Sequence, residues 1–177
     1  MKSVSLVLVV TSLFLSGCAF KTSPYGASMK NVDSIKTSEI KPVAVSKFQS
    51  TKPGLSSIMC RGVGPVTVES SFENYIEKAF IDELKLAGAY NPNSSFILSG
   101  KLEEVDFSSG MTDGKWLFTL SLTNAKNESV TTQSSFPFSG SFIGDRACGE
   151  VAQVFSLSVQ KLIADVVQNP KFKQIAN

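Results

Sequence analysis

Two neighbouring segments of alternating side chains constrain the fold of this 177-residue chain more than any other feature. In residues 116–122 every second side chain is large and apolar, and residues 130–138 repeat the alternation and end on Phe136 and Phe138. Most of the intervening positions are Ser, Thr or Gln. Because successive side chains of a strand point to opposite faces of a sheet, each segment predicts a strand with one buried and one solvated face. Together they predict an antiparallel hairpin whose second strand is an exposed edge, open to strand addition by a partner.

Two further strands are expected before this hairpin. Residues 96–107 alternate as well, but the apolar phase changes between Leu102 and Val105, which predicts a β-bulge near Glu103 and Glu104. Another strand is predicted over residues 42–48. The glycine-rich residues 60–65 are expected to be a loop, and they lack the GK[ST] ending and the GxGxxG spacing of phosphate-binding loops.

Two segments have the three- and four-residue apolar period of amphipathic helices. The first begins at Ser70, whose spacing to Glu73 fits a capping box, and ends before Gly88. The second covers about residues 148–168 and is ended by Pro170. Each helix has a single apolar face that must be buried against another layer. The sequence therefore predicts an α+β domain with a small antiparallel sheet and two helices packed on one face.

The first residues have the organisation of an exported protein. Lys2 provides a positive charge, residues 4–15 an apolar run, and Ser16-Gly17 the small residues before a cleavage site, so residues 1–17 predict a signal peptide. A transmembrane helix needs about 20 apolar residues, and this run is shorter.

The mature chain is expected to begin with an unstructured segment. Residues 18–41 are polar and lack an apolar period, which predicts a flexible tether ahead of a single α+β periplasmic domain over residues 42–177. The tail, residues 171–177, is expected to be frayed.

At Leu15-Ser16-Gly17-Cys18 the chain resembles the lipobox of bacterial lipoproteins. The resemblance implies cleavage before Cys18 and acylation of that cysteine with palmitate-type chains, which would attach the protein to a membrane by its lipid. Ala19 follows the cysteine, and in the enteric members of the family a residue other than Asp at this position implies sorting to the outer membrane, here facing the periplasm. Inner-membrane placement and exposure on the cell surface stay open as alternatives.

The order of elements over residues 42–168, behind a lipobox, is similar to the small periplasmic domains of envelope accessory lipoproteins. These include lipoprotein activators of penicillin-binding proteins, the N-terminal half of curli-secretion lipoproteins, and auxiliary lipoproteins of ABC-type transporters. The resemblance implies an accessory or scaffold component of an envelope protein complex, with a protein partner and no enzymatic activity. The alternative is a carrier for a small or lipidic ligand, which would need a cavity lined by four aromatic side chains, Phe96, Phe118, Phe136 and Phe155.

Catalytic chemistry has little support in the composition. The sequence contains no histidine, which excludes Ser-His-Asp and Cys-His nucleophile systems and His-ligated metal sites, and no cofactor is expected. Among residues 103–106 only Glu104 and Asp106 share one side of a strand, so a carboxylate pair for a cell-wall hydrolase is a third hypothesis beside a solvated strand end. Basic and acidic residues nearly balance, 17 against 15, and no basic stripe indicates a nucleic-acid partner.

Two cysteines stay available once Cys18 is acylated. Cys60 and Cys148 belong to an exported protein, and thiols oxidise in the compartments that such proteins reach, so the sequence predicts a disulfide between them. Both positions were expected at the starts of the two helices, which would be neighbours if the helices run side by side in the same direction.

The chain has only two arginines, and each lies beside one of these cysteines. A disulfide would bring Arg61 and Arg146 into one neighbourhood with Asp145 and Glu150. Two interpretations stay open: a structural knot, in which arginine pairs with carboxylates and bridges loop backbone, and a polar partner or small-anion site.

Overall fold

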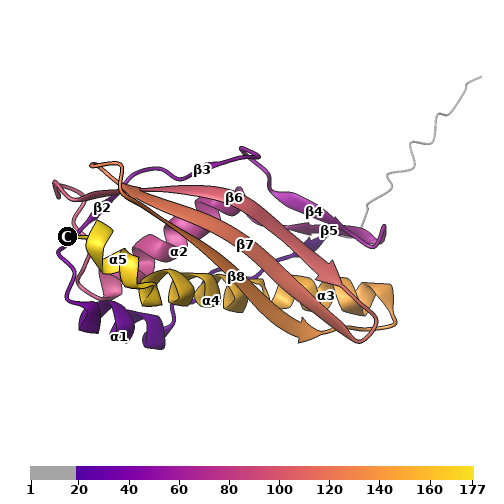
Figure 1. Ribbon diagram of the computed structural model, residues 1–177. Helices are drawn as coiled ribbons and strands as arrows, with labels where there is room; N and C mark the ends of the chain where they lie inside the picture. Colours follow the sequence, from indigo (N-terminus) through magenta and orange to yellow (C-terminus); the bar gives the residue numbers. More distant parts are fainter. Residues whose placement is uncertain (1–18) are drawn as a thin grey trace, which may run out of the picture.

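A computed structural model describes residues 19–177, and Figure 1 shows its helices gathered along one side of long, twisted strands. The main sheet has the strand order β2-β6-β7-β8, and β3 also pairs with β6. The three long strands are antiparallel to one another, whereas the two short ones run parallel to β6. The α+β class is confirmed, and the sheet is larger than predicted. Its strands are β2 (Ala44–Val45), β3 (Gln49–Ser50), β6 (Ile97–Ser109), β7 (Asp113–Asn124) and β8 (Ser129–Ser139).

The predicted hairpin and bulge are both present. β7 and β8 pair with Trp116 opposite Phe136, and the alternate side chains of β7 are buried as expected. The register between β6 and β7 shifts between Leu102 and Glu104. The extra residue at this bulge keeps Leu102 and Val105 on the inner face although they are three positions apart.

The glycine-rich residues 60–65 belong to a second, small sheet, so the predicted loop is confined to the turn at residues 61–63. β4 (Ser57–Cys60) and β5 (Gly64–Thr67) form a hairpin, and β1 (Phe20–Lys21) pairs with β5 in parallel. Arg61 and Gly62 adopt left-handed backbone angles, with φ of 48° and 68°. Such residues let the chain reverse tightly, so the segment serves as a hairpin turn.

The helices are more numerous than expected because the predicted second helix is divided in two. Its first part begins four residues early, at Gly144, and the two parts meet at Val154. The first predicted helix is capped by Ser71 and not by Ser70, and Glu73 accepts a hydrogen bond from the Gly54 amide (2.8 Å), outside the expected capping box. The helices are α1 (Met29–Ser38), α2 (Phe72–Leu86), α3 (Gly144–Gln153), α4 (Phe155–Gln168) and α5 (Pro170–Ile175).

Residues 19–41 fold with the domain, so the prediction of a flexible tether over residues 18–41 is wrong for the part that the structure describes. They form β1 and α1, and α1 buries Asn31, Val32 and Ile35 against the other helices. The predicted frayed tail is wrong as well, because α5 buries Phe172 and Ile175. Elements this short contain too few apolar side chains to show a period, and packing orders them. The predicted signal peptide and Cys18 lie outside the described residues.

Candidate functional site

The disulfide predicted between Cys60 and Cys148 is present, with the two Cα atoms 5.8 Å apart. Its setting differs from the one expected, because Cys60 ends strand β4 and only Cys148 lies on a helix, α3. Both cysteines are fully buried. The bond therefore joins the small sheet to the helical layer at one end of the molecule.

Arg61 bridges backbone from two other connections at this end. Its Nε donates to the carbonyl oxygen of Ser109 (2.9 Å), one terminal nitrogen donates to Ser141 (2.8 Å), and the other donates to Gly110. These acceptors belong to the end of β6, to the β6–β7 connection and to the segment between β8 and α3. Arg61 therefore has the structural role that one of the two interpretations predicted. It binds backbone carbonyl groups and not the carboxylates that were also expected.

The structure does not bring the other three residues of the predicted polar cluster into contact with Arg61. Arg146 and Asp145 are exposed on α3, and Glu150 is half-buried on the same helix. The ion pairs among residues 19–177 are Lys101–Glu103 and Lys161–Asp165, and neither includes these residues. A partner or anion site at this cluster therefore stays a prediction.

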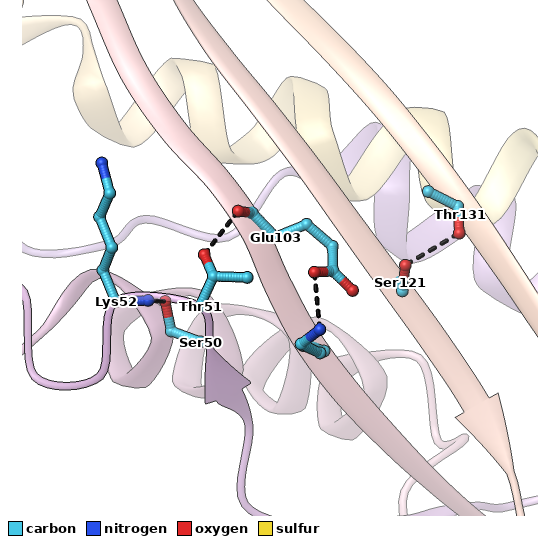
Figure 2. Close-up of polar contacts among 7 residues, drawn as sticks. Ser50, Thr51, Lys52, Glu103, Ser121 and Thr131 are labelled. Carbon is cyan, nitrogen blue, oxygen red and sulfur yellow. Dashed lines mark hydrogen bonds and ion pairs between the residues drawn. The ribbon is translucent and has the colours of Figure 1, made fainter.

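The outer face of the main sheet is covered mainly by polar side chains, and Leu117 is an apolar exception between Asp106 and Ser135. Ser121 and Thr131 form a hydrogen bond across β7 and β8 (2.8 Å), and Thr51 donates to the carbonyl oxygen of Glu103 (2.6 Å) beside β6. Figure 2 shows both contacts on this face, which the helices leave open. We call it the open face, and it includes Ser99, Lys101, Glu104, Asp106, Thr119, Ser121, Thr123, Thr131, Gln133 and Ser135.

Strand β8 is the edge of the main sheet, as predicted. It pairs with β7 on one side, and within residues 19–177 no strand pairs with its other side. Its inner face contacts α4, where Ser134 donates to Asp165 (2.6 Å). Thr131, Gln133 and Ser135 are exposed, so the free edge and the open face are continuous. Pro137 has no backbone N–H, so it interrupts the row of amide donors near the end of the strand, as prolines of edge strands do.

The carboxylates considered for catalysis lie on the open face. Glu104 accepts a hydrogen bond from Thr119 (3.3 Å), and Asp106 accepts one from the Phe107 amide (2.8 Å). The hollow that they border with residues 50–52 measures about 80 Å³. Ligand pockets usually begin at roughly 300 Å³. The geometry therefore adds no support to the hydrolase hypothesis.

The four aromatic side chains proposed to line a carrier cavity do not surround one space. Phe118 and Phe155 are buried against Trp116, with ring centroids 5.8 Å and 4.8 Å from that of Trp116. Phe96 lies under the Lys41 ammonium (4.6 Å) on the β2 side, and Phe136 is half-buried on β8. The interior between sheet and helices is thus packed with aromatic rings where the carrier hypothesis needs a ligand.

A groove lies outside this core, at the start of α2. It measures about 680 Å³ and is bordered by Lys47, Ser50, Pro53 and Glu73, among others. Glu73 is only 7% exposed, and its Oε2 has no hydrogen-bond partner among the described residues. An unpartnered carboxylate oxygen at a groove can accept hydrogen bonds from a cationic or amide group of a ligand.

A buried acidic group that the sequence analysis missed holds the first residues of the domain. Glu83 of α2 is fully buried, and its Oε1 accepts hydrogen bonds from the Tyr25 hydroxyl, the Ser28 amide (3.1 Å) and the Asn31 side chain (3.2 Å). Burial raises the pKa of Glu83, and these hydrogen bonds oppose the rise. Burial and the neighbouring carboxylate also raise the pKa of Tyr25.

The spacing of Glu83 from the apolar residues of α2 indicates that it could be buried. Glu83 follows Ala79 by four residues and Phe80 by three, which places it at the border of the apolar face of α2. A local pattern favours the solvated face for a residue at this border, because glutamate is rarely buried unless it is paired.

Comparisons with known proteins show the fold. No protein-family model matches the chain, and no curated protein matches it. Its structure is similar to the crystal structure of a Xanthomonas campestris protein of the family model DUF330, with a TM-score of 0.50 and 10% sequence identity over 85% of this chain and 92% of that one. A candidate lipoprotein from Caulobacter crescentus also aligns, with a TM-score of 0.31 and 13% identity over 76% of this chain and 96% of that one. The first of these likenesses establishes a shared α+β architecture.

Among residues 19–177, no helix combines the length and apolar character needed to cross a membrane.

Proposed function

We propose that this protein is a lipid-anchored accessory component of a protein complex in the bacterial cell envelope, without enzymatic activity of its own. The observation that carries the proposal is the free edge of β8, which is continuous with the open face. The lipid on Cys18 would hold the domain at the outer membrane, and the exposed edge would receive a protein partner in the periplasm.

The anchor is supported by the sequence Leu15-Ser16-Gly17-Cys18 and by the position of the first strand. Phe20 is already part of β1, so the folded domain begins two positions after Cys18, with only Ala19 between them. Two residues of extended chain span at most about 7 Å. A lipid on Cys18 would therefore hold the domain close to the membrane, without the tether expected from the sequence.

A protein partner is supported by the chemistry of the edge. An unpaired strand presents backbone N–H and C=O groups, and an extended segment of another chain can pair with them. Thr131, Gln133 and Ser135 are short or uncharged, so they leave the backbone accessible. Native edges that must stay free often have lysine at such positions, and β8 has none.

Crosslinking in intact envelopes tests this part of the proposal. A photo-activatable amino acid at Gln133, on the exposed edge, is expected to form a discrete adduct with one envelope protein. The same group at Lys171, which is exposed on α5, serves as the matched control. Equal adducts from both positions, or none from Gln133, would contradict a partner at this edge.

Mass spectrometry tests the anchor separately. Protein from the membrane fraction should begin at an acylated Cys18, and the Cys18→Ser variant should accumulate as an unlipidated precursor. Recovery of the wild type as mature protein with a different first residue would refute lipidation at Cys18.

The groove at the start of α2 favours a second candidate function, a binding module for a small ligand with a cationic or amide group. The buried Oε2 of Glu73 is the observation that favours it. Screening small amines by ligand-detected NMR should find binding that is lost in Glu73→Gln and kept in Glu69→Gln, whose side chain is exposed. Equal binding to both variants would remove this candidate.

A further inference from the structure

Four exposed apolar side chains lie at the end of the molecule that contains the disulfide. Val63 is 40% exposed, Met111 62%, Phe142 76% and Ile143 63%. They come from the β4–β5 turn, the β6–β7 connection and the segment before α3. Figure 1 shows these three parts at one end, with α5 and the C-terminus at the other. We call these four residues the apolar tip.

The apolar tip is held together by the contacts already described at this end. Arg61 donates to carbonyl oxygens of both neighbouring connections, and the Gly140 amide donates to the Thr112 carbonyl oxygen (3.0 Å). Val63 packs beside Gly144, where a Cβ atom would come within 2.9 Å of the valine methyl group. The disulfide joins α3 to β4 at the same end of the molecule. These hydrogen bonds and the disulfide therefore hold the segments that present the four side chains in a fixed arrangement.

The chain reaches the domain from the same end. β1 runs parallel to β5, with Phe20 opposite Val66, and β5 begins at Gly64, directly after Val63 of the tip. Because paired parallel strands share one direction, the chain before Phe20 comes from the side on which the β4–β5 turn lies. Cys18 is two residues before Phe20, so acyl chains on it would start near the apolar tip.

A lipid surface fits this end better than a soluble partner does. Lys21, Arg61, Lys115 and Arg146 are exposed around it, together with Asp113 and Asp145, so basic side chains are in small excess. The attraction would come mainly from apolar burial and from the anchor, which confines the tip to the vicinity of a bilayer. Exposed apolar patches mark interaction sites, and here the anchor determines which surface is close.

We propose that the apolar tip inserts into the lipid surface to which Cys18 is attached, so that α5 points away from the membrane. The inference rests on the anchor of the proposed function. It adds an orientation, in which the open face and the edge of β8 stand roughly upright on the bilayer and are accessible from the side.

Tryptophan quenching in vesicles tests this orientation. The lipidated, full-length protein is purified from membranes and reconstituted into vesicles of phosphatidylethanolamine and phosphatidylglycerol, with or without brominated acyl chains. Phe142→Trp should show a blue-shifted emission and lose most of its intensity to brominated lipid. Leu157→Trp, at an exposed position on α4 outside the tip, is the matched control and should keep its intensity. The buried Trp116 of the wild type supplies the background to subtract.

The outcomes separate the tip from the anchor, because mass spectrometry of the same preparation reports acylation of Cys18 independently. Quenching of Phe142→Trp well above that of Leu157→Trp supports insertion. Acylated protein whose Phe142→Trp emission stays water-like and responds to iodide would overturn the inference while leaving the anchor intact. Equal quenching at both positions would also overturn it, because it would show a domain without a preferred orientation.

Discussion

The hydroxyl of Tyr25 donates a hydrogen bond to Oε1 of Glu83, a carboxylate buried on α2. This contact joins residues separated by 58 positions and fastens the first part of the described chain to the core. Tyr75 adds a second link, because its hydroxyl donates to the carbonyl oxygen of Ser23 (2.9 Å). The segment from Phe20 onward is thus built into the domain, so an anchor at Cys18, if present, would leave the domain little freedom.

Removing the Tyr25 hydroxyl should weaken the fold. Tyr25→Phe leaves the buried carboxylate with one hydrogen bond fewer, and hydrogen bonds to charged groups contribute about 1.5–3 kcal/mol. We expect a loss of that size in the free energy of unfolding, measured by urea denaturation at neutral pH. Tyr90→Phe is the control, because its hydroxyl has no partner among the described residues, and it should change stability little. Equal effects of the two substitutions would contradict a role for the Tyr25–Glu83 contact.

Glu83 should make stability depend on pH with a defined sign. Its pKa is raised in the folded protein, so the folded state holds a proton at pH values where the unfolded chain has lost it. This contribution is fully present below the unfolded-state pKa of about 4.3 and is lost as the pH rises through the folded-state pKa. Glu83→Gln should abolish that decline, in urea denaturation between about pH 4 and pH 8.

Glu39→Gln is the control for the pH experiment, because Glu39 is exposed at the end of α1. Its stability should follow the wild-type curve. A constant difference between the wild type and Glu83→Gln at every pH would show that Glu83 does not titrate differently in the two states.

The disulfide should contribute strongly to stability. It joins residues 88 positions apart, and closing a loop of this length stabilises the folded state by about 4–5 kcal/mol in the chain-entropy model. The double variant Cys60→Ala with Cys148→Ala should lose about that amount in urea denaturation. Reductant should destabilise the wild type to a similar degree and leave the double variant unchanged. Two free thiols in denatured, non-reduced wild-type protein would refute the bond.

Arg61 and Arg146 should behave differently although each is close in sequence to a disulfide cysteine. Arg61→Lys cannot make the three hydrogen bonds to separate carbonyl groups, so we expect faster hydrogen exchange in residues 109–112 and 140–143 and a stability loss of about 1–2 kcal/mol. Arg146→Lys, on the exposed side of α3, should alter neither measurement. Similar effects of both variants would favour the joint polar site predicted from the sequence.

The sequence by itself determined the long strands and the covalent link. Alternation over residues 116–122 and 130–138 is a local property, and it identifies the buried face of β7 and β8 whatever packs on it. The change of phase between Leu102 and Val105 likewise located the bulge, because a strand can return its apolar side chains to one face only with an extra residue. The disulfide followed from counting the thiols of a chain that is predicted to be exported.

Only the tertiary structure decided the parts with few apolar residues. α1 buries three side chains and α5 two, such as Ile35 and Phe172, and β1 contributes only the half-buried Phe20. These are too few for a period but enough for order once a neighbouring layer covers them. Glu83 became an interior group because Tyr25 and Asn31, more than fifty positions away, supply its hydrogen bonds. A local pattern cannot contain such partners, since burying a charge is favourable only when groups from distant segments arrive to satisfy it.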